Sequence, residues 1–119
     1  MRKPTTSKNV IATSRELDKL IEEAIVDCHD EDEQASGFFN MIEENLVLPF
    51  TTQILGVEVS VVDFEMDDDG ALKAVCKHGG KRQRIGLTDL PLPSPLPPGA
   101  QWIAAYRRWR RGRGHDDEE

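Results

Sequence analysis

Hydrophobic residues in the first part of the chain recur three or four positions apart, which is the spacing of one face of a helix. The first stripe consists of Leu17, Leu20, Ile21, Ala24, Ile25 and Cys28. Thr13 and Glu16 stand before it with the spacing of a capping box, so we expect a helix to begin there. A second stripe predicts a helix from about Asp32 to Leu46. Gly37 lies within that helix and weakens it unless another element packs close by.

From Phe50 onward the hydrophobic period becomes two, which is typical of strands. Hydrophobic and polar residues alternate up to Val61, and the alternation slips by one position at Val62, which predicts a β-bulge. Gly79 and Gly80 then predict a two-residue hairpin turn.

The hydrophobic faces of these strands predict their register, because a slip of one residue would turn every side chain to the other face. Phe64 is expected to pair with Ala74 in the first hairpin, and Ala74 with Ile85 in the second. On the opposite face this register places Glu65 beside Lys73.

Residues 91–98 hold five of the seven prolines, which predicts a stiff, extended connector. A last helix follows, with an aromatic stripe made of Trp102, Ile103, Tyr106 and Trp109. The expected fold is an α+β domain with two N-terminal helices, a small twisted antiparallel sheet or SH3-like barrel, and a C-terminal helix. We expect a disordered arm over residues 1–12, a single domain over 13–111 and a disordered acidic tail over 112–119.

The chain has 119 residues, a length that fits one domain. No stretch of about 18 apolar residues could form a transmembrane helix, and the N-terminus lacks the apolar run of a signal peptide. The two cysteines are too few for a disulfide framework or a cysteine-rich zinc site. We therefore expect reduced thiols, a cytoplasmic location and no membrane partner.

The net charge of −7 hides an uneven distribution. Residues 16–69 carry seventeen acidic residues and one basic residue, whereas residues 70–115 carry ten basic residues and one acidic residue. Such asymmetry indicates binding more than catalysis. The sequence also shows no nucleophile elbow and no glycine-rich loop that opens a helix, so no enzymatic activity is expected.

Carboxylates are densest between the two predicted helices. This main cluster consists of Asp27, Asp30, Glu31, Asp32 and Glu33. At least four of these carboxylates are expected to converge with almost no cation nearby. Hard oxygen ligands without sulfur or imidazole suit Ca²⁺, which takes six to eight oxygens in flexible geometry. The alternative is an acidic cap at the start of the second helix, stabilised by the helix dipole.

A second candidate site lies in the predicted turn between strands and consists of Glu65, Asp67, Asp68 and Asp69. It is not an EF-hand, because with Gly70 at loop position 6 the twelfth position is Cys76, where a bidentate glutamate is required. A calcium-binding turn remains open, as does a solvated hairpin loop in which Glu65 pairs with Lys73.

The residues described above resemble the cyanobacterial-type calcium-binding (CcbP-like) protein family. The resemblance covers about residues 16–111 and is most specific in the segment from Ile21 to Phe50. The sheet region is much less specific, and the helix that carries Trp102, Tyr106 and Trp109 is also similar. It implies a small acidic α+β cytoplasmic protein that binds Ca²⁺ without EF-hands and buffers or signals, with residues 27–33 as the main binding region. This chain is less acidic in its strands and last helix than the family pattern, and its Asp67 turn lies in a variable region.

The sequence thus predicts a non-EF-hand calcium-binding protein, with the calcium ion as cofactor. The first alternative is an interaction module whose acidic surface recognises a basic protein or mimics nucleic acid. A nucleic-acid binder that uses the basic strands and the C-terminal arginines is the weakest interpretation, because aromatic residues at that spacing are more often core residues.

Overall fold

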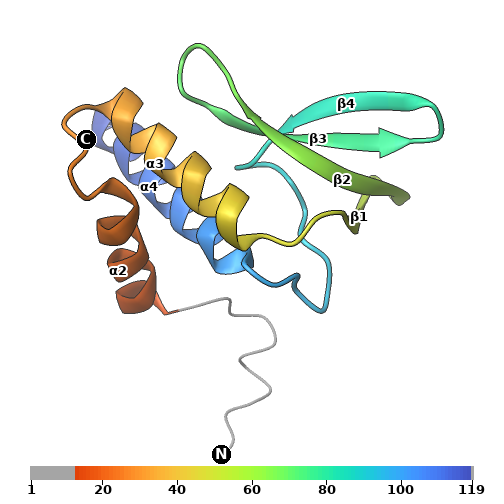
Figure 1. The fold of residues 1–119 in the computed structure, drawn as a ribbon, viewed down its shortest axis with the longest axis horizontal. Coiled ribbons are helices and arrows are strands. Elements are labelled where there is room, and N and C mark those ends of the chain that lie inside the picture. The colour runs from red at the N-terminus through yellow and green to blue at the C-terminus, as the bar shows by residue number, and fades with distance from the viewer. Residues whose placement is uncertain (1–12, 119) are drawn as a thin grey trace, which may run out of the picture.

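The structure is a computed structural model that describes residues 13–118, with side chains described as far as Gly112. The elements follow one another as two helices, four strands and a long last helix (Figure 1). The expected arm at residues 1–12 lies outside the described residues. Backbone of the last helix continues past residue 111, where the sequence placed the end of the domain. The division into arm, domain and tail stays a prediction.

Helices α2 (Ser14–Ile25) and α3 (Glu31–Asn45) form the predicted N-terminal pair. The capping box is confirmed: Thr13 Oγ1 accepts from the Glu16 N–H, and the Glu16 side chain accepts from the Thr13 N–H. Gly37 explains how closely the helices pack. A Cβ atom built there would lie well under 3.0 Å from the Ala24 carbonyl oxygen, so only glycine lets the α2 backbone lie directly on α3.

Four strands form an antiparallel sheet in the order in which they occur along the chain. They are β1 (Phe50–Ile54), β2 (Val57–Met66), β3 (Leu72–His78) and β4 (Lys81–Gly86). The expected pairs Phe64–Ala74 and Ala74–Ile85 are confirmed, as is the bulge between Val61 and Asp63. The sheet is open, so the SH3-like barrel alternative is wrong. The separate edge strand β1 was not predicted.

Helix α4 (Ala100–Glu118) carries the predicted aromatic stripe into the core. The ring centroids of Phe38, Tyr106 and Trp109 lie within 6.0 Å of one another, between α3 and α4. Tyr106 is almost fully buried, and its hydroxyl accepts a hydrogen bond of 2.9 Å from the Leu72 N–H. Helix α4 is thereby tied to the start of β3.

The three helices gather on one side of the sheet (Figure 1). The connector of prolines returns past the edge of the sheet, where the Thr52 hydroxyl donates to the Pro91 carbonyl at 2.7 Å. No helix among residues 13–118 is long and apolar enough to cross a bilayer.

Candidate metal centre

Two members of the main acidic cluster cap a helix. Asp30 is the N-cap of α3, and its Oδ1 accepts from the Glu33 N–H at 2.9 Å. Glu33 reaches back, and its Oε1 accepts from the His29 N–H at 2.6 Å. The first bond satisfies a backbone donor that the first helical turn leaves unpaired, and the second ties the chain before the cap to that turn. The alternative that the sequence left open, an acidic helix cap, therefore holds for these two residues.

The loop between α2 and α3 surrounds a thiol with negative charge. Partial burial and the carboxylates of Glu33, Asp27 and Asp30 together raise the pKa of the Cys28 thiol. Asp27 adopts a left-handed backbone conformation with φ of 64°, which turns the chain from one helix to the next. The pKa of this thiol is therefore sensitive to the charge of three carboxylates of the main cluster.

The second cluster occupies the turn between β2 and β3, and part of its charge is neutralised. Lys73 Nζ lies 3.1 Å from Asp67 Oδ2, and Arg84 Nε donates to Glu65. The expected ion pair between Glu65 and Lys73 is wrong, because both side chains take other partners although their backbones are paired as predicted. The Oδ1 atom of Asp69 accepts from the N–H of Ala71 at 3.2 Å, which stabilises the turn.

The structure brings the two acidic clusters together at Gly70. This glycine is buried, has a φ of +84°, and packs against the first turns of α3. A Cβ atom built on it would meet the Ala35 Cβ at 3.5 Å and the Asp32 Oδ1 at 3.8 Å. Both distances are ordinary van der Waals contacts, so it is the left-handed backbone and not a lack of space that favours glycine here. In Figure 1 the β2–β3 turn reaches toward the start of α3.

Sequence reasoning treated the two clusters as separate sites and missed this contact. Gly70 predicted a turn, but the spacing of residues in the sequence does not indicate which helix the turn packs against. We call the combined surface, made of residues 27–33 and 67–69, the acidic edge.

The carboxylates of the acidic edge do not converge as the sequence predicted. Within the part of the chain that the structure describes, no three side chains of Asp, Glu, His or Cys lie close enough together to hold a metal ion. The physical reason is the cap: Asp30 and Glu33 are directed at backbone N–H groups, and Asp32 is directed toward Gly70. Which residues would ligate an ion therefore stays a prediction.

The donor set of the acidic edge nevertheless suits one class of ion. All its charged side chains are carboxylates on a loop, a first helical turn and a hairpin turn, and they are mostly exposed. Exposed carboxylates on such segments can rotate toward a cation at little cost. Ca²⁺ accepts six to eight oxygens with irregular geometry and can include water, whereas Mg²⁺ demands a near-octahedral set.

Two solved structures share this architecture. One is Anabaena CcbP, with a TM-score of 0.63 and 19% sequence identity over 85% of this chain and 94% of that one. The chain has the CcbP-like fold. The second structure is described as a calcium binding protein in the calcium-binding form. It has a TM-score of 0.66 and 20% identity over 88% of this chain and 96% of that one. No family model matches the sequence, and no curated protein matches it.

The CcbP-like fold confirms the resemblance seen in the sequence at the level of architecture. The matches cover nearly the whole of both known structures and more than four fifths of this chain. At about 20% identity the likeness concerns the fold alone.

Proposed function

We propose that this protein is a non-EF-hand calcium-binding protein without catalytic activity, which binds Ca²⁺ at the acidic edge and serves as a calcium buffer or signalling protein. The observation that carries the proposal is the approach of the turn at Gly70 to Asp32, which brings together two acidic segments that lie far apart in the sequence. Folding therefore concentrates negative charge along one edge. The likeness to a protein described as calcium-binding supports the same assignment.

The proposed ligands are the carboxylates of Asp27, Asp30, Glu31, Asp32 and Glu33, with Asp68 and Asp69 contributing from the turn. Asp30 and Glu33 use one oxygen each for the helix cap, which leaves the second oxygen of each group for an ion. Two carboxylates held about 4 Å apart repel by several kcal/mol at a reduced effective dielectric, and a divalent cation removes that repulsion.

A calorimetric titration with CaCl₂ tests the proposal. Asp30→Asn combined with Asp32→Asn removes two charges but keeps the helix cap, because Asn is as good an N-cap as Asp. We expect the affinity to fall at least tenfold, which is about 1.4 kcal/mol. The matched control is Glu43→Gln with Glu44→Gln, two exposed carboxylates near the other end of α3, which should leave the affinity within about twofold.

The turn is tested separately with Asp68→Asn and Asp69→Asn. These changes should weaken binding a few-fold through the lost negative potential and leave the stoichiometry unchanged. A stoichiometry lower by one would instead make the turn a second site. An unchanged titration curve in the Asp30 and Asp32 variant would remove the α2–α3 loop from the binding site.

Thermal unfolding separates specific binding from a general counter-ion effect. A ligand that binds only the folded chain stabilises it by RT ln(1+[L]/Kd), about 2.7 kcal/mol at a hundredfold excess over Kd. We expect CaCl₂ at about 1 mM in about 0.15 M KCl to raise the Tm by roughly 10–15 °C. Equal small shifts with Ca²⁺ and Mg²⁺ would contradict the proposal.

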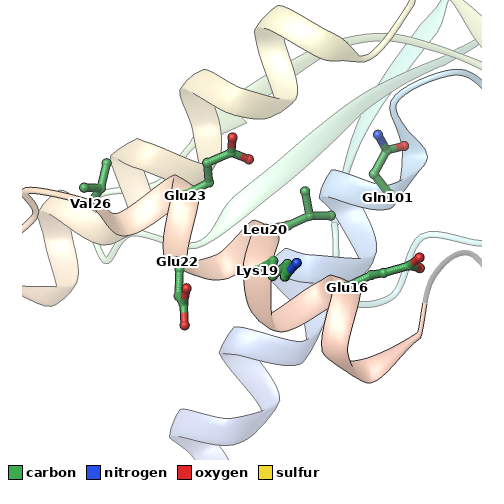
Figure 2. A pocket seen from close by; sticks show the side chains of 7 residues that line it. All are labelled: Glu16, Lys19, Leu20, Glu22, Glu23, Val26 and Gln101. Carbon is green, nitrogen blue, oxygen red and sulfur yellow. The ribbon is translucent and has the colours of Figure 1, made fainter.

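A second candidate function has one observation in its favour. A groove of about 860 Å³ runs along α2 and reaches α4 at Gln101 (Figure 2). Leu20 and Val26 supply apolar surface there, and Val26 is 63% exposed. Glu16, Glu22 and Glu23 give the groove its negative charge, only partly balanced by Lys19. A basic, apolar segment of a partner protein fits this chemistry, and equal Ca²⁺ and Mg²⁺ shifts would favour this function.

A further inference from the structure

One end of the sheet carries an uncovered apolar surface. The β1–β2 and β3–β4 turns lie at the same end of the meander, and this end projects past the helices in Figure 1. A shallow cavity of about 370 Å³ crosses all four strands there. Its apolar lining consists of Ile54, Leu55, Val57, Val59, Cys76 and Ile85. We call this surface the distal trough.

The apolar lining of the distal trough is open to solvent at its outer end. Leu55 is 98% exposed and Val57 is 43% exposed. Leu55 also sits in a left-handed backbone conformation, with φ of 51°, at a tight turn where Asn or Gly is the favoured residue. A large apolar side chain therefore stands fully exposed at a position whose backbone disfavours it. Burial among the described residues therefore does not account for a leucine at this place.

The rim of the distal trough is cationic, and its charges form no ion pair within the part of the chain that the structure describes. The β3–β4 register sets Lys77 directly opposite Arg82, on the face away from Cys76 and Ile85, whereas Lys81 lies on the same face as those two residues. Like charges in such cross-strand pairs destabilise a sheet. Among the described side chains, no carboxylate forms an ion pair with Lys77, Lys81 or Arg82, and none lines the cavity. Arginine and lysine elsewhere in the same hairpin are paired, because Arg84 contacts Glu65 and Lys73 contacts Asp67.

We propose that the distal trough is a docking site for an acidic amphipathic segment of another protein, whose apolar side chains fill the trough and whose carboxylates meet Lys81 on the apolar face and Lys77 and Arg82 at its edge. Charge complementarity requires an anionic partner, and the apolar lining requires one that also carries hydrophobic side chains. Single-stranded nucleic acid fits less well, since no Phe, Tyr or Trp lines the trough to stack on a base. A flat anionic bilayer can touch Leu55 but cannot enter a concave surface.

This site is separate from the acidic edge, so its test does not depend on whether the protein binds calcium. The probe is a fluorescein-labelled synthetic peptide in which leucines recur at helical spacing and glutamates occupy the other positions. Fluorescence polarisation measures its affinity for the whole chain in about 0.05 M and about 0.15 M salt. We expect saturable binding that weakens with salt, and no binding of two control peptides, one with serine for leucine and one with lysine for glutamate.

Three variants locate the binding site. Lys81→Glu with Arg82→Glu should weaken peptide binding at least tenfold. Arg15→Glu with Lys19→Glu makes the same change of charge on exposed positions of α2 and should alter affinity less than twofold. Leu55→Asn removes the apolar contact while relieving the backbone, so it should weaken binding at least threefold without lowering the Tm.

The proposal is overturned if the leucine–glutamate peptide fails to bind at about 1 mM, or if both charge-reversal variants lose affinity equally. It is also overturned if vesicles of anionic phospholipid or an oligonucleotide bind at this end of the sheet and the peptide does not. Concentration-dependent self-association that Lys81→Glu with Arg82→Glu abolishes, without peptide binding, would assign the distal trough to a second copy of this chain instead.

Discussion

Replacing Gly37 by alanine tests how the two N-terminal helices are held together. In an ordinary exposed helix this change stabilises by about 1 kcal/mol, because alanine is the better helix former. In this fold the new Cβ would lie well under 3.0 Å from the Ala24 carbonyl oxygen, 3.2 Å from the carbonyl carbon and 3.5 Å from the Cys28 Sγ. The obstacle is backbone, which cannot rotate away as a side chain would.

The magnitude follows from that geometry. The helices must separate by roughly 1 Å, and overpacking of this kind costs about 1–3 kcal/mol or more. The upper part of that range applies, because the whole of α2 has to shift. After subtraction of the helix-propensity gain, we expect a net loss of about 1–2 kcal/mol. For a domain of this size that corresponds to a Tm lower by roughly 5–15 °C.

The assay is thermal and urea unfolding followed by circular dichroism. Gly112→Ala is the matched control, because that glycine is also helical and a Cβ there meets nothing within 4 Å. The control should hold the Tm or raise it by a few degrees. Since the α2–α3 loop joins the two displaced helices, Gly37→Ala should also weaken calcium binding. A Tm raised by both variants alike would refute the close approach of α2 to α3.

Four further outcomes can be measured. Burial and neighbouring carboxylates raise the pKa of Cys28, and bound Ca²⁺ should lower it by neutralising the carboxylates. Alkylation of Cys28 by iodoacetamide near pH 8 should then be faster with Ca²⁺, with buried Cys76 as an unreactive internal standard, and an unchanged rate would mean that calcium does not bind at this loop. Tyr106→Phe leaves the buried Leu72 N–H without its acceptor and should cost about 1–3 kcal/mol in urea unfolding. Burial raises the pKa of Tyr106, so the unfolded chain loses this proton first and stability should fall as the pH rises above about 10; the Phe variant should lack that part of the fall. Leu55→Asn should raise the Tm by a few degrees, since a left-handed conformation costs leucine about 1 kcal/mol, and a lower Tm would show that Leu55 supports the fold.

The parts of the fold that the sequence predicted correctly are those set by neighbouring residues. The capping box at Thr13 needs only two residues three positions apart. The register of Phe64 with Ala74 follows from alternation and a short turn, and the bulge at Val61 follows from a slip in that alternation. Strand β1 escaped prediction because its own pattern is weak, and its buried Thr52 is satisfied by Pro91, a residue far along the chain.

The candidate site was predicted less well, because its geometry depends on tertiary packing. The sequence located both acidic clusters, but it could not show that the β2–β3 turn at Gly70 would lie beside Asp32. Nor could it show that Glu65 would turn to Arg84 and leave Lys73 for Asp67. Side chains in an exposed cluster choose among several partners of similar energy, and only the full arrangement of the chain decides between them.

The contact between the first and last helices has a consequence for the order of folding. Every strand of the sheet pairs with its neighbour in sequence, so the meander closes only short loops and can form early. The Arg108–Asp18 ion pair joins α4 to α2 across 90 residues of sequence. The Trp109–Gln34 hydrogen bond joins α4 to α3 across 75 residues. Contacts of that separation have to close the longest loops of the chain. We therefore expect α2 to dock last, so that substitutions on its α4-facing side accelerate unfolding and leave the refolding rate almost unchanged.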